Sequence, residues 1–117
     1  MGLSTHVLDT AHGCPAAGMQ VTLQRTAAPD AAQTIKKLTL NADGRADGPL
    51  LDTPQLAPGR YRLLFEVAPY FRSRGVVLPD PPFIDTVQID FGIADATSHY
   101  HVPLLVSPWS YSTYRGS

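Results

Sequence analysis

The chain has 117 residues, of which 44% are hydrophobic and only 16% are charged. Nine Lys and Arg face ten Asp and Glu, for a formal net charge of −1, so no broad attraction to nucleic acid or anionic lipid is expected. This length predicts one domain over residues 1–117, built around a single core.

Compartment signals are few. Cys14 is the single cysteine, which excludes an intrachain disulfide, so the fold does not depend on oxidising conditions. No stretch approaches the ~20 apolar residues that span a bilayer. The N-terminus lacks the basic and apolar regions of a secretory signal. We therefore expect a cytoplasmic protein with neither a nucleic-acid nor a membrane partner.

Short alternating segments predict an all-β sandwich or barrel, because the eleven prolines and nine glycines fall mostly between them. Asn41-Ala42-Asp43-Gly44 is the strongest turn signal, since glycine accepts the positive φ of a tight turn. A short helix is expected over residues 68–75, with Gly75 as its stop. Turns are expected over 13–18 and 27–33. Strands are expected over residues 3–9, 19–24, 34–40, 60–67, 84–93, 100–106 and 110–115.

Strand periodicity directs two histidines and a tyrosine away from the core, because residues two apart in a strand point the same way. His6 points away from residues 5 and 7. Alternate positions from 100 to 106 are uniformly large and apolar, so His101 and His99 lie on the opposite face. Tyr114 also lies on an outward face. Imidazoles and a phenol there, in place of Lys, Glu or Thr, indicate a cleft or a subunit interface.

These residue types suit acid–base chemistry on an anion. Imidazole is the usual general acid or base at neutral pH, and an arginine such as Arg45 can hold an anion or a developing oxyanion. Each of them taken alone is more often solvated or structural, and a C-terminal tail is often frayed. His99 and His101 have a spacing that can chelate zinc or copper, but no carboxylate or cysteine cluster accompanies them. Periodicity alone leaves the function open.

Three motifs carry a resemblance to a known family. They are the final segment His99–Ser117, which ends Tyr-Arg-Gly-Ser, the N-terminal segments Leu3–Thr10 and Gly13–Ala16, and the central Asn41–Arg45. Together they resemble the signatures of the 5-hydroxyisourate hydrolases, in the transthyretin-like protein family. The ending Tyr-Arg-Gly-Ser distinguishes these enzymes from the hormone carrier transthyretin. Trp109, where a smaller aromatic is more usual, and Cys14 depart from the pattern outside the site positions.

The resemblance implies a transthyretin-like two-sheet β-sandwich of seven or eight strands with one short helix. It also implies a homotetramer, a dimer of dimers, with sites at the dimer–dimer interface. Position by position, it places His6, Arg45, His101 and Ser117 at catalytic positions, and His6, Arg45, Tyr114 and Ser117 at substrate-binding positions.

The activity implied is hydrolysis of 5-hydroxyisourate, the product of urate oxidation. Water opens the ring at the N1–C6 amide and gives 2-oxo-4-hydroxy-4-carboxy-5-ureidoimidazoline (OHCU). The resemblance makes His6 and His101 the acid–base pair and leaves open which of them is the base. No metal or organic cofactor is expected, because the scissile carbonyl is already activated within an electron-poor ring.

Two rival classes carry different expectations. A non-catalytic carrier that used the same channel would have apolar or lysine side chains where His6, His101 and Tyr114 stand. Such a carrier would bind an iodinated thyronine without hydrolysing 5-hydroxyisourate. A structural β-sandwich module of a larger assembly is disfavoured by the short chain and the lack of linkers.

Overall fold

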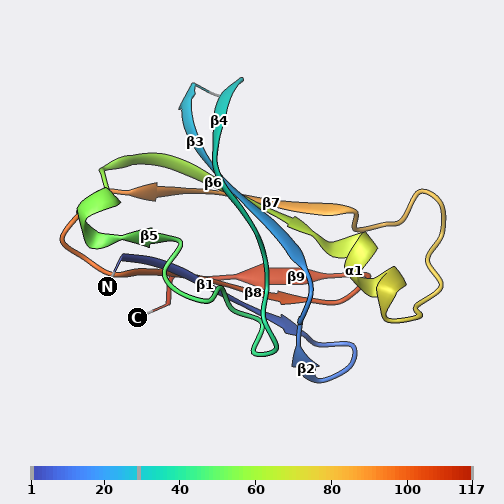
Figure 1. The fold of residues 1–117 in the computed structure, drawn as a ribbon. Helices are drawn as coiled ribbons and strands as arrows, with labels where there is room; N and C mark the ends of the chain where they lie inside the picture. The colour runs from blue at the N-terminus through green and yellow to red at the C-terminus, as the bar shows by residue number, and fades with distance from the viewer. Residues whose placement is uncertain (1, 29, 117) are drawn as a thin grey trace.

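Two β-sheets stack face to face in the computed structural model, which describes residues 2–28 and 30–116 (Figure 1). The first sheet has the order β2-β1-β8-β9, and β5 also pairs with β1. Its strands are β1 (Gly2–Asp9), β2 (Cys14–Pro15), β5 (Leu51–Asp52), β8 (Tyr100–Val106) and β9 (Tyr111–Thr113). The second sheet has the order β4-β3-β6-β7. Its strands are β3 (Gln20–Ala28), β4 (Ala31–Thr39), β6 (Gly59–Glu66) and β7 (Thr86–Ile93).

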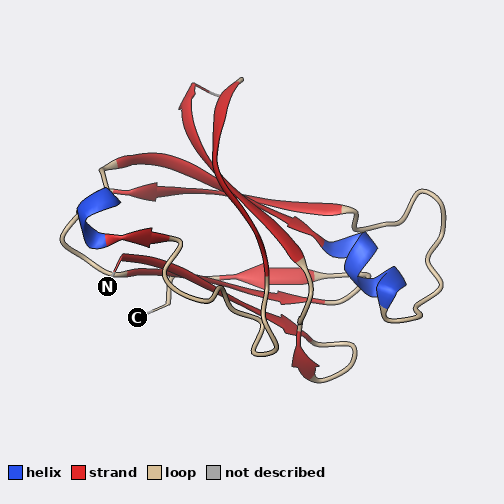
Figure 2. Ribbon diagram, in the orientation of Figure 1, coloured by secondary structure: helices blue, strands red, loops and turns tan. Residues whose placement is uncertain are grey.

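Two short helices complete the described chain (Figure 2). The 3-10 helix η1 (Thr53–Gln55) follows β5, and α1 (Val67–Ser73) links β6 to the loop before β7. Gly75, just beyond α1, has φ +83°, so the expected helix stop is confirmed. Among the described residues, no helix has the length and apolar character that would let it cross a membrane.

The predicted all-β sandwich with one α-helix is confirmed. The two-residue strands β2 and β5 bring the described strands to nine. The largest difference is the β3–β4 hairpin, which continues through most of the segment expected to turn over 27–33. This hairpin projects beyond the sandwich, and all of β4 but one residue is exposed (Figure 1). A strand exposed on both faces needs no apolar alternation, so the pattern that marks the other strands is missing here.

The core lies between the two sheets and follows the predicted alternation. Tyr61, Leu63 and Phe65 of β6 are at most 1% exposed, and each such side chain stabilises the fold by roughly 1.5–3 kcal/mol. In β8 the residues at 100, 102, 104 and 106 are buried, as are those at 3, 5 and 7 in β1. The alternate residues therefore form an outer face of the first sheet, which includes Ser4, His6, Leu8, His101 and Leu105.

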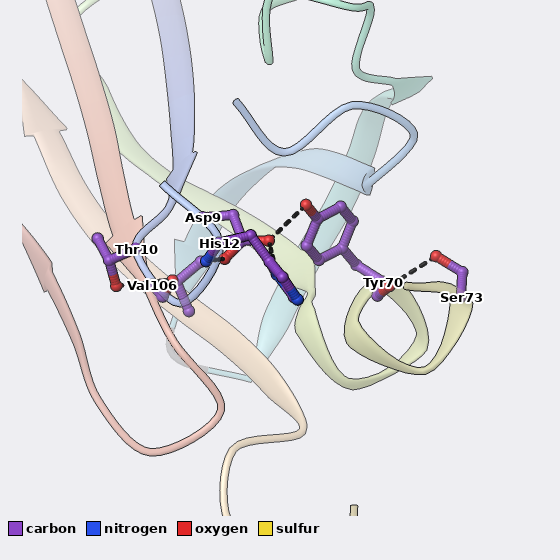
Figure 3. Close-up of polar contacts among 6 residues, drawn as sticks. All are labelled: Asp9, Thr10, His12, Tyr70, Ser73 and Val106. Atoms are coloured by element: carbon purple, nitrogen blue, oxygen red, sulfur yellow. Dashed lines mark hydrogen bonds and ion pairs between the residues drawn. The ribbon is translucent and has the colours of Figure 1, made fainter. Parts of the chain in front are cut away.

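A buried carboxylate ties the end of β1 to α1 (Figure 3). The Asp9 carboxylate accepts hydrogen bonds from the Tyr70 hydroxyl (2.7 Å), the His12 backbone N–H (2.9 Å) and the His12 ring Nδ1 (2.6 Å). Burial opposes ionisation, but the hydrogen bonds from Tyr70 and His12 outweigh it and lower the pKa of Asp9. Burial, and then the bond to Asp9, raise the pKa of Tyr70. The strand that carries His6 is thereby anchored at its C-terminal end.

We expect Tyr70→Phe to lower the free energy of unfolding at pH 7 by about 1–2 kcal/mol, because a buried carboxylate oxygen loses a donor. The folded-state pKa of Asp9 is depressed, so its stabilisation is present above the unfolded pKa of about 3.9 and is lost as pH falls through the lower folded value. The difference between the two proteins should therefore shrink in acid. Urea unfolding at pH 7 and pH 3 measures it, with Thr39→Val, which removes an exposed hydroxyl on β4, as control. Equal unfolding midpoints at pH 7 for Tyr70→Phe and the parent chain would contradict the expectation.

Candidate active site

Two histidines lie on adjacent strands and face outward from the first sheet. The strands β1 and β8 run parallel, with Ser4 opposite His101 and His6 opposite Pro103. An inter-strand spacing of ~4.8 Å and a rise of ~3.3 Å per residue place the Cα atoms of His6 and His101 about 8 Å apart. Both side chains are half-buried, so each ring is partly shielded yet open to a small molecule.

A tight turn holds Arg45 beside β1. The Gly44 N–H donates to the Asn41 carbonyl (2.9 Å), and the Asn41 side-chain oxygen accepts from the Arg45 N–H (3.2 Å). The Val7 N–H donates to the Gly44 carbonyl (2.9 Å), and His6 and Arg45 form an antiparallel bridge. Gly44 has φ +71°, and a Cβ there would lie 2.5 Å from the Val7 carbonyl oxygen. Glycine is therefore required, and the predicted turn brings Arg45 next to His6.

Burial and neighbouring positive charge lower the pKa of both histidines. For His6, desolvation is the larger cause and Arg45 the second, while the backbone and the charge of Asp43 act in the opposite direction. For His101, desolvation is followed by the charges of Arg45, His6 and His99. Both rings therefore stay neutral to lower pH than an ordinary imidazole with a pKa of about 6.5. An unprotonated imidazole is what a general base requires.

The C-terminal tail returns alongside β8 and packs on one of these rings. The Gly116 N–H donates to the His101 carbonyl (2.8 Å). A Cβ at Gly116 would lie 2.5 Å from Cδ2 of His101, so the absence of a side chain lets the tail contact the imidazole. Arg115 anchors the same tail, because its guanidinium lies 4.2 Å from the ring centroid of Tyr100 and donates to the His99 carbonyl (3.4 Å).

The two remaining predicted site residues are Tyr114 and Ser117. Tyr114 is 61% exposed, and the shared register of β9 and the tail places it opposite Pro103, on the outer face. Tyr114 also borders a hollow of about 370 Å³ between the tail and β7. Its hydroxyl makes no hydrogen bond within the described parts of the chain to either histidine. Ser117 lies outside the described residues. The structure thus groups the two histidines with Arg45.

Ser4 was missed as a site residue by the sequence interpretation. Its hydroxyl lies 2.8 Å from Nδ1 of His101 and 3.4 Å from Nε2 of His99. Alternation places Ser4 on the face of His6, but the pairing of its strand with β8 is not a local signal. Across residues 2–28 and 30–116, no group of three or more His, Cys, Asp or Glu side chains is arranged to hold a metal ion.

Comparison with known proteins places this arrangement in a family. A model described as the HIUase/Transthyretin family matches residues 3–116. 5-Hydroxyisourate hydrolase 2 of Rhizobium meliloti (strain 1021) is 56% identical over 115 residues, which cover 98% of this chain and 95% of that protein. The solved 5-hydroxyisourate hydrolase of Klebsiella pneumoniae is 36% identical with a TM-score of 0.76, and 100% of each chain is covered. Sea bream transthyretin in complex with thyroxine is 26% identical with a TM-score of 0.87, covering 99% of this chain and 95% of that one. This chain belongs to the HIUase/Transthyretin family.

Proposed function

We propose that this chain, with residues 1–117 as one domain, hydrolyses 5-hydroxyisourate to OHCU in urate breakdown. That the chain is an enzyme, a 5-hydroxyisourate hydrolase, follows from relatives of that activity that match almost its whole length. The observation that carries the proposed mechanism is the grouping of His6, Arg45 and His101 on one sheet face. This grouping joins two neutral imidazoles to one fixed positive charge.

The proposed reaction is a metal-free attack of water on the ring amide. One imidazole takes a proton from the water as its oxygen bonds to C6. The N1–C6 bond then breaks, its electron pair goes to N1, and N1 receives a proton. The other imidazole orients the water or protonates N1. The lowered pKa values of His6 and His101 support this scheme, because both rings are available in the neutral form at pH 7.

Arg45 supplies the positive charge that balances the negative charge of the substrate and of the intermediate. Its side chain is exposed beside His6, so a ligand can reach it. We assign it to bind the urate-like anion and to stabilise the oxyanion that forms when water adds to C6. Tyr114 and Ser117 are assigned to close the pocket and to hydrogen-bond the substrate or the water.

A homotetramer with sites at its dimer–dimer interface is the proposed assembly. Strands β7 and β9 lie at the edges of their sheets, and residues of both strands line the hollow that Tyr114 borders. Edge strands offer unpaired backbone groups, so a second copy can extend both sheets at once. The exposed Trp109 and Tyr111 fit such burial. A cytoplasmic location is proposed with this assembly.

Freshly generated 5-hydroxyisourate tests the activity directly. With the protein present, the absorbance of the substrate should decay faster than the spontaneous rate, in proportion to protein concentration. Decay at the spontaneous rate, together with equilibrium binding of an iodinated thyronine, would instead assign the chain as a carrier.

The contact between the tail and His101 leads to a prediction of its own. We expect Gly116→Ala to lower kcat roughly 10- to 100-fold, since the added methyl group displaces the imidazole or the tail. Gly48→Ala is the matched control, because a Cβ at Gly48 meets no atom within 4 Å. Steady-state kinetics measure both variants. Equal kcat in Gly116→Ala and Gly48→Ala would show that this packing does not position the ring.

A further inference from the structure

Ser4 lies between two imidazoles on the outer face of the first sheet. Its Oγ is 2.8 Å from Nδ1 of His101, a residue 97 positions away in the chain, and 3.4 Å from Nε2 of His99. All three side chains are half-buried. The contact follows from the register of the parallel β1–β8 pair, in which Ser4 and His101 are direct partners. Two rigid strands therefore hold this hydroxyl against the ring.

The hydrogen bonds around Ser4 have a preferred direction. His99 Nδ1 is buried and has no hydrogen-bond partner in the described parts of the chain. A buried N–H without an acceptor is rarer in native structures than an under-satisfied acceptor, so neutral His99 keeps its proton on Nε2. That N–H points at the Ser4 hydroxyl, which accepts it and directs its own proton to Nδ1 of His101. Neutral His101 then carries its proton on Nε2.

We propose that Ser4, backed by His99, is a positioning residue that fixes the ring and the tautomer of His101, so that its Nε2–H serves as a hydrogen-bond donor and His6 serves as the base. The proposal rests on the proposed hydrolysis and deepens it. His6 takes the proton of the attacking water and returns it to N1 when the N1–C6 bond breaks. The Nε2–H of His101 donates to the carbonyl oxygen at C6 and keeps its proton throughout.

The neighbours of His6 suit a base, and the neighbours of His101 suit a hydrogen-bond donor. The turn that carries Arg45 bridges to His6, and the backbone of Asp43 in that turn accepts a hydrogen bond from the His6 ring, whereas the partner of His101 is the Ser4 hydroxyl. A hydroxyl that donates to Nδ1 leaves the proton of neutral His101 on Nε2, whereas a carbonyl that accepts from one nitrogen of neutral His6 leaves the other nitrogen bare to take a proton. The structure thereby separates two chemically identical side chains.

The tautomer is measured without substrate, by ¹⁵N chemical shifts of the histidine rings at pH 8. The His101 signals are assigned by their loss in His101→Asn. In the parent protein we expect a protonated Nε2 and a bare Nδ1 on His101. Ser4→Ala should lose this preference and Ser4→Thr, which keeps the hydroxyl, should restore it. A proton on Nδ1 of His101 in the parent protein would overturn the proposal.

Kinetics supply the second readout. Ser4→Ala should lower kcat roughly tenfold, equivalent to about 1.4 kcal/mol, with KM nearly unchanged, and Ser4→Thr should recover most of the loss. Thr39→Ala, on the exposed strand β4 of the second sheet, is the control and should keep the parent kcat. A kcat equal to that of the parent protein in Ser4→Ala overturns the positioning role. A parent protein without hydrolysis overturns the proposed function, whereas the ¹⁵N result tests the tautomer separately.

Discussion

His6→Asn should lower kcat/KM by about 10²- to 10⁴-fold, the range of general acid–base catalysis, and His101→Asn by about 10²- to 10³-fold, the range for loss of one hydrogen-bond donor to the oxyanion. Asparagine keeps a polar side chain of similar reach but cannot exchange a proton near neutral pH. Both side chains project from well-packed strands toward the outer face, so their replacement leaves the buried residues of β1 and β8 in place. The assay follows loss of substrate absorbance after the spontaneous rate is subtracted. Unchanged turnover in both variants would end the assignment.

The double variant distinguishes one catalytic unit from two independent effects. If both rings act on the same water and the same carbonyl, the loss in the double variant should be far smaller than the product of the single losses. His12→Asn is the control, because His12 bonds to Asp9 at the end of β1. It should alter stability and keep kcat/KM. A double loss equal to the product of the two single losses would show that the two histidines act independently and not on one bound substrate.

The outward direction of His6 and His101 could be predicted from sequence because it depends only on local alternation. Residues 100–106 place large apolar side chains at every second position, and those side chains are buried in the structure. The turn before Arg45 is equally local, since Gly44 at its end has the positive φ that the motif requires. Strand alternation and this turn were therefore enough to predict that the two histidines face outward and that Arg45 follows a tight turn.

The pairing of distant strands is not a local property, and the missed features depend on it. Ser4 and His101 become partners only because β1 pairs with β8 in one register. A shift of one residue would turn the hydroxyl to the opposite face. The close fit of Gly116 to the His101 ring likewise follows from the return of the tail along β8. The sequence shows which residues are present but not which distant residues they contact.

Arg45→Gln should lower kcat/KM by about 10²- to 10³-fold, because it removes the guanidinium assigned to bind the substrate anion and to stabilise the oxyanion. The same variant should change the pH profile. Arg45 lowers the pKa of His6 and of His101, so removal of its charge raises both values. A general base works in its neutral form, and the acid limb of kcat/KM reports the pKa of the free enzyme. The acid limb should therefore move to higher pH in Arg45→Gln.

Arg45→Lys separates the charge from the shape of the guanidinium. A lysine keeps the positive charge but lacks the planar fork of donors that matches an anion. We expect its acid limb to stay near that of the parent enzyme while kcat/KM remains reduced. Arg60→Gln, an exposed arginine on β6 of the second sheet, controls for the loss of one surface charge. If the acid limbs of Arg45→Gln and Arg60→Gln coincide, the charge of Arg45 does not tune the base, and its contribution lies in anion binding alone.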